Sequence, residues 1–146
     1  GAALVAAGVG VWLGFFHTGH VSRAELRARH HVYRWSHLRC RQSEGTGGAE
    51  FTIDAGPVPR YGIPREPTLM IRINGHPLPG RFTTGPNAGW RVARVLFSLD
   101  GVSYSPRLVH LTVTDPHGVG TFVVHLHGTT RAGVEETFPA SGTFAC

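Results

Sequence analysis

The sequence predicts an α+β protein: an N-terminal transmembrane helix, a basic amphipathic helix, and then a small, mainly antiparallel β-sheet domain. Three observations predict this arrangement. Residues 1–16 carry no charge, residues 21–44 place apolar side chains at helical spacing, and residues 45–146 alternate short apolar runs with turn residues. We therefore divide the chain into an anchor (1–20), a helix (21–44) and a β-rich soluble domain (45–146).

The uncharged opening segment is typical of a membrane helix. Sixteen helical residues rise about 24 Å, and a hydrocarbon core of about 30 Å needs a few more. Residues upstream, or His17 to His20 at the interface, would complete the span. Small residues recur at every fourth position, which lets membrane helices pack closely: Ala2, Ala6, Gly10 and Gly14. A signal-peptide core and a buried soluble helix are the alternatives.

The next segment has the features of a helix start. Ser22 to Glu25 matches a capping box, and an apolar stripe follows at helical spacing: Ala24, Ala28, Val32, Trp35 and Leu38. A basic amphipathic helix over 21–44 binds either anionic lipid headgroups or an acidic protein surface. Its candidate contact residues are Arg23, Arg27, Arg34, Trp35 and Arg41. The alternative is a solvated arginine face above the core of the domain.

The distribution of charge excludes a nucleic-acid-binding domain. Residues 1–42 hold six arginines and one acidic residue, Glu25, whereas residues 43–146 hold eight basic and eight acidic residues. A nucleic-acid binder carries its basic surface on the folded domain. The β-rich domain has no net charge, so we expect no nucleic-acid partner.

Five or six strands are predicted after Gly48. They are Phe51 to Ala55, Thr68 to Asn74, Trp90 to Leu99, Arg107 to Thr114, Val119 to His127 and, as an edge strand, Thr137 to Phe144. Gly56 to Pro67 holds four prolines and reads as a loop. Asp100-Gly101 is a hairpin signal.

The last hairpin allows its register to be predicted. Matching the apolar faces of its two strands pairs Thr112 with Thr121 and His110 with Val123. His110, His125 and His127 then share the opposite face, where three imidazoles have the ligand set of a zinc site. No carboxylate in the hairpin is placed to support such ligands. The alternative is a polar sheet face, covered by solvent, the helix or another subunit.

The two cysteines, Cys40 and Cys146, bracket the β-rich domain. In an oxidising compartment they can form a disulfide that closes a long loop, and in a reducing one they are free thiols. We find no phosphate-binding loop, no Rossmann glycine pattern and no G-x-S-x-G motif. The motifs therefore identify no enzyme class.

Residues 68–101 read TLMIRINGHPLPGRFTTGPNAGWRVARVLFSLDG, and Gly56-Pro57 stands at the entry to the predicted sheet. In these two features the chain resembles a mitochondrial inner-membrane family, which includes the cytochrome oxidase assembly factor and a related import-translocase subunit. The resemblance covers about a third of the chain, and residues 102–146 have no counterpart. The resemblance implies a noncatalytic role, with respiratory-chain or translocase partners and no cofactor.

We therefore expect a membrane-anchored, noncatalytic accessory or scaffolding subunit of an energy-transducing complex. Its expected location is the mitochondrial inner membrane, and the sequence does not assign the β-rich domain to either side of it. Its expected partners are other membrane subunits and anionic headgroups. One alternative is a membrane-tethered zinc hydrolase or lyase that uses His110, His125 and His127. The other is a receptor-like or viral ectodomain with a Cys40–Cys146 bridge.

Overall fold

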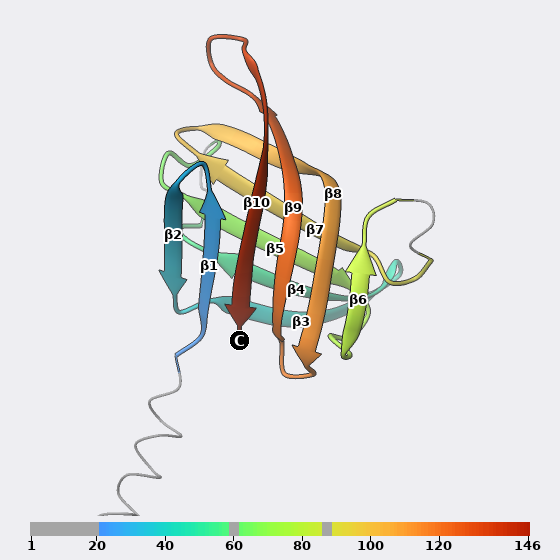
Figure 1. Ribbon diagram of the computed structural model, residues 1–146. Coiled ribbons are helices and arrows are strands. Elements are labelled where there is room, and N and C mark those ends of the chain that lie inside the picture. The colour runs from blue at the N-terminus through green and yellow to red at the C-terminus, as the bar shows by residue number, and fades with distance from the viewer. Residues whose placement is uncertain (1–20, 59–61, 86–88) are drawn as a thin grey trace, which may run out of the picture.

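The computed structural model describes residues 21–58, 62–85 and 89–146, which form a curled antiparallel β-sheet (Figure 1). The predicted α+β class is wrong, because the described residues contain strands and no helix. The strands are β1 (Arg23–Ala28), β2 (His31–Ser36), β3 (Arg39–Gly45), β4 (Gly48–Ala55), β5 (Thr68–Asn74), β6 (Gly80–Thr83), β7 (Ala93–Leu99), β8 (Val102–Asp115), β9 (Val119–Thr129) and β10 (Glu135–Ala145).

The basic amphipathic helix predicted over 21–44 is also wrong, because this segment forms β1, β2 and most of β3. In β1 the buried residues Ala24, Leu26 and Ala28 alternate with charged ones, which is the two-residue period of a strand. A hairpin turn at Arg29 and His30 reverses the chain, and both residues have positive φ. That backbone conformation favours the right-handed twist of a β-hairpin and excludes a continuous helix.

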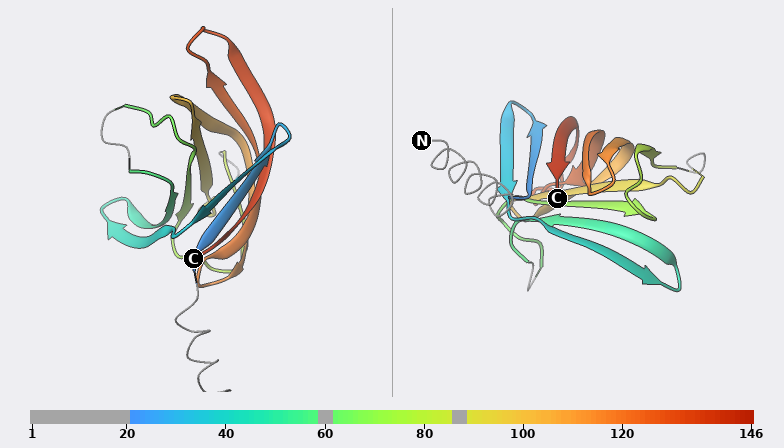
Figure 2. Two further views of the ribbon diagram at one scale, coloured as in Figure 1. Left: turned by 90° about the vertical axis from the view of Figure 1, so that its left-hand side faces the viewer. Right: turned by 90° about the horizontal axis from the view of Figure 1, so that it is seen from below.

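The strands follow one another in the order β2-β1-β10-β9-β8-β7-β5-β4-β3, and β6 pairs with β8 beside this path. We call β2, β1, β10, β9, β8 and β6 half-sheet A, and β7, β5, β4 and β3 half-sheet B. The long strand β8 joins them, because its start pairs with β7 and its remainder pairs with β9. The two half-sheets form two layers whose strands cross (Figures 1 and 2).

Several strand predictions are confirmed. The strand at Thr68–Asn74 has the predicted bounds, and Asp100 and Gly101 form the turn between β7 and β8. The β8–β9 register is also as predicted, with Thr112 opposite Thr121 and His110 opposite Val123. The edge position predicted for Thr137 to Phe144 is wrong, because β10 lies between β9 and β1. The second neighbour of β10 is β1, which was not predicted because its residues lie in the segment interpreted as a helix.

The core lies between the two half-sheets and is formed by the inward side chains of nearly every strand. Its largest fully buried members include Phe82, Phe97 and Phe122. Half-sheet B contributes Ile53 from β4 and Ile71 from β5, both without exposed surface. Because the interior is filled by apolar side chains, polar chemistry is confined to the outer faces and the loops.

The anchor predicted for residues 1–20, with its packing positions Ala2, Ala6, Gly10 and Gly14, lies outside the described residues. In the part of the chain that is described, no helix is long and apolar enough to cross a membrane.

Candidate functional site

The five residues predicted to contact lipid or a partner do not share one face. Arg23, Arg27 and Arg34 extend from the outer face of half-sheet A, where all three are exposed. Trp35 turns inward, and its indole N–H donates to the carbonyl oxygen of Pro67 at 2.9 Å. Arg41 belongs to half-sheet B, next to Asp54. These five residues would share one face only in a helix. In the observed strands they lie on different faces and in different half-sheets.

Glu25 links β1 to β2 on this outer face. Its carboxylate accepts from Arg27 Nε at 2.8 Å and from Arg34 Nε at 3.1 Å. The hydrogen bond from Arg27 is the main reason why the pKa of Glu25 lies below its usual value, with Arg34 acting in the same direction. These contacts neutralise part of the basic charge, whereas Arg23 forms no ion pair with a described residue.

The three predicted metal-ligating histidines do share the outer face of half-sheet A. His110 lies opposite Val123, His125 opposite Leu108, and His127 opposite Ser105. His127 Nδ1 is 3.0 Å from Thr137 Oγ1. Among residues 21–58, 62–85 and 89–146, no three His, Cys, Asp or Glu side chains are grouped to hold a metal ion. The zinc site stays a prediction, and metal analysis of the purified protein tests it.

Exposed apolar side chains lie among these histidines. Val123 is 53% exposed, and Leu108 and Val32 are each 44% exposed. Pro139 is exposed as well, and the register places it opposite His125. We call these four residues, Val32, Leu108, Val123 and Pro139, the apolar patch. The sequence carried one signal for it, since Val123 interrupts the polar side of an otherwise alternating strand.

A shallow groove crosses the apolar patch beside the β1–β2 hairpin. Its lining includes Val32, Val123 and Pro139, together with Arg27 and Arg29. In the register, Arg27 and Ser141 lie between Val32 and Val123, so the groove combines apolar and basic side chains. Such a surface is suited to an apolar partner with an acidic rim.

Arg29 fixes the tip of this hairpin against β10. Its guanidinium forms an ion pair with Glu136 and lies 4.1 Å from the ring centroid of Phe138. Glu136 also accepts from the Tyr104 hydroxyl at 3.4 Å. Burial of Tyr104 raises the pKa of its phenol above the usual value. The Arg29 guanidinium thus packs on core residues at the inward side of half-sheet A, and these contacts hold the tip of the β1–β2 hairpin in place.

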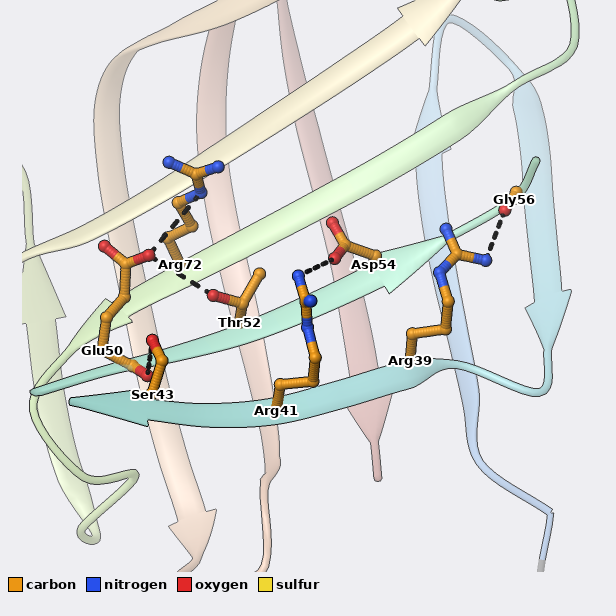
Figure 3. A network of polar contacts seen from close by, with 8 residues as sticks. All are labelled: Arg39, Arg41, Ser43, Glu50, Thr52, Asp54, Gly56 and Arg72. Carbon is orange, nitrogen blue, oxygen red and sulfur yellow. Dashed lines mark hydrogen bonds and ion pairs between the residues drawn. The ribbon is translucent and has the colours of Figure 1, made fainter. Parts of the chain in front are cut away.

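The outer face of half-sheet B carries a second polar network (Figure 3). Arg39 Nη1 donates to the carbonyl oxygen of Gly56 at 2.9 Å, and Arg41 Nη2 is 3.6 Å from Asp54 Oδ2. Arg72 Nε is 3.9 Å from Glu50 Oε1, which also accepts from Thr52 Oγ1 at 3.4 Å. Sequence reasoning missed this network, because it depends on the register of three strands, β3, β4 and β5.

Cys40 and Cys146 form a disulfide in the structure. Cys40 belongs to β3, the end strand of half-sheet B, and Cys146 directly follows β10 of half-sheet A. The Cys146 amide also donates to the carbonyl oxygen of Gly118, at the β8–β9 turn. The bond therefore ties one end of the curled sheet to the centre of the other half.

No family model matches the chain, and no curated protein and no solved structure matches it either. The similarity to the oxidase assembly and translocase family stays a prediction from residues 68–101.

Proposed function

We propose that the chain is a noncatalytic accessory subunit, held in a membrane by its opening segment, which binds a neighbouring subunit through the outer face of half-sheet A. The observation that carries the proposal is the apolar patch. The solvent face of an antiparallel sheet is ordinarily polar. Here Val123 is more than half exposed at the centre of such a face.

The charges around the patch indicate the chemistry of the partner. Arg27 lies opposite Val32, and His110 lies opposite Val123. An apolar partner surface bordered by carboxylates would cover the valines and pair with the arginine. Burial of three or four such side chains contributes about 25 cal/mol for each Å² of apolar surface that is removed from water.

The disulfide supports a location on an oxidising side of the membrane. Disulfides persist in secreted proteins, the periplasm and comparable compartments, and are rare in the cytosol. A β-domain with a Cys40–Cys146 bond fits such a compartment. Membership of a respiratory-chain complex, and the mitochondrial inner membrane as its place, remain part of the proposal and are supported only by the sequence resemblance.

The test is Val123→Asp in the full chain, expressed in its native membrane and solubilised in mild detergent. A carboxylate inside an apolar contact costs at least about 2 kcal/mol, or roughly thirtyfold in affinity. On native gels we expect the natural protein to migrate in a large assembly, and the variant to leave this assembly but to stay in the membrane. Deletion of residues 1–16 should instead release the protein from the membrane.

Ser103→Asp is the matched control, because Ser103 is exposed at the start of β8, where this strand pairs with β7 of half-sheet B and lies away from the apolar patch. It adds the same charge and should migrate like the natural protein. Migration of Val123→Asp in the large assembly would overturn the proposal. About one zinc ion per purified chain, with hydrolase activity, would favour the enzymatic alternative instead.

A further inference from the structure

A line of arginines crosses the outer face of half-sheet B, away from the apolar patch. The register aligns Arg41 of β3, Thr52 of β4, Arg72 of β5 and Arg94 of β7. Directly opposite residues have Cβ atoms about 4.5–5.5 Å apart, and like charges in that position destabilise a sheet. Arg72 and Arg94 form such a pair.

The acidic residues of this face do not satisfy the two guanidinium groups. Glu50 Oε1 is 3.9 Å from Arg72 Nε, which is beyond hydrogen-bond distance. Arg72 Nε is buried and has no hydrogen-bond partner. Arg94 is exposed, and no described residue pairs with it. Two adjacent positive charges therefore keep unused donors.

We propose that Arg72 and Arg94 bind a phosphate group, presented by a free phosphate or by a lipid headgroup. This inference goes beyond the proposed function, because it concerns the other half-sheet. An anion between the two guanidinium groups would offset their repulsion and accept their free N–H donors. Glu50 belongs to β4 and Arg94 to β7, on opposite sides of β5. An anion between Arg72 and Arg94 would therefore lie on the side of β5 away from the Glu50 carboxylate.

The charge and shape of the ligand favour phosphate over a carboxylate. A phosphate monoester carries about −1.5 to −2 charges and three acceptor oxygens. Two opposed guanidinium groups supply two positive charges and several N–H donors in a fork geometry that suits such an ion. A single carboxylate brings only two acceptor oxygens, fewer than the free N–H donors that the two guanidinium groups offer. We therefore argue for a phosphate group and treat an acidic peptide as a rival outcome.

The test measures binding of inorganic phosphate to the full chain by calorimetry, at low ionic strength because exposed charges are screened by salt. The variant is Arg94→Gln, which removes one charge and breaks no hydrogen bond or ion pair with a described residue. The control is Arg81→Gln, an equally exposed arginine in β6 of half-sheet A. Loss of charge-assisted hydrogen bonds should weaken binding at least about tenfold in Arg94→Gln only.

Vesicles separate the two sources of phosphate. Flotation measures how much protein binds to phosphatidic acid vesicles and how much binds to phosphatidylcholine vesicles. The apolar opening segment contributes to both, so the difference between them reports the headgroup alone. An Arg94-dependent preference for phosphatidic acid, with or without binding of free phosphate, supports a phosphate site and assigns it to headgroups. Binding of free phosphate alone supports a soluble ligand.

Three results would overturn the proposal. One is no binding of phosphate in either form, and another is an equal loss in Arg81→Gln and Arg94→Gln, which indicates diffuse attraction. The third is Arg94-dependent binding of a glutamate-rich peptide without binding of phosphate. None of these results bears on the apolar patch, so failure here leaves the Val123→Asp test intact.

Discussion

Single residues show how closely β9 and β10 pack. Gly142 lies opposite Phe122, and Phe144 lies opposite Gly120, so each phenyl ring covers a glycine on the neighbouring strand. A side chain at either glycine would overlap both the ring and backbone atoms. The two pairs therefore fix the approach of β9 and β10 in the centre of half-sheet A.

Replacing Gly142 with alanine should destabilise the protein. The new methyl group would overlap the backbone oxygen of Glu25 and the ring of Phe122, so strands must move apart. We expect the free energy of unfolding to fall by about 2–3 kcal/mol, as in other overpacked cores. Denaturant unfolding measures the change.

Gly47→Ala is the control for this prediction, because nothing lies within 4 Å of the position of its added carbon. It should alter the unfolding free energy by less than about 1 kcal/mol. Equal stabilities for Gly142→Ala and the natural protein would contradict the close packing of β9, β10 and β1.

At the scale of strands and hairpins, the sequence pattern of each element explains why its prediction succeeded or failed. The β8–β9 hairpin was predictable because its strands alternate over most of their length and Asp115 to Gly118 supplies ordinary turn residues. The β1–β2 hairpin was not, because its turn is made by Arg29 and His30 without a glycine or asparagine. The alanines at positions 24 and 28 fit the spacing of a helix as well as that of a strand. The helix was predicted because Ser22 to Glu25 matches the sequence of a capping box.

The candidate sites depend on the same difference. The histidine face followed from one local hairpin, so its register could be predicted. Arg72 and Arg94 lie opposite each other on β5 and β7. These two strands are separated along the chain by β6 and its flanking loops. Pairing across such a distance is set by the packing of the whole sheet. No local pattern at Arg72 or Arg94 indicates it.

At the scale of the whole molecule, the described residues form one curled, open sheet. β2 and β3 follow each other along the chain, yet they lie at opposite ends of the strand order. The Ser22 hydroxyl accepts from the Leu38 amide at 2.6 Å at this junction. The Cys40–Cys146 disulfide adds a covalent bond between β3 and the end of β10, across 106 residues.

Removing the disulfide in Cys40→Ser/Cys146→Ser should lower stability strongly. On the chain-entropy model a loop of this length contributes about 4–5 kcal/mol, a large fraction of a typical domain stability. Denaturant unfolding should show this loss, and a reductant should then have no further effect on the double variant. An unchanged unfolding midpoint would contradict a stabilising role for the bond.

The most direct measurement for the central claim is site-specific photo-crosslinking in intact native membranes. A photoreactive amino acid replaces Val123 in one variant and, in another, Ser103, which is exposed at the start of β8 beside β7 of half-sheet B. The account predicts a discrete adduct with one membrane subunit from position 123 and none from position 103. No adduct from position 123, or the same adducts from both positions, would contradict binding through the apolar patch.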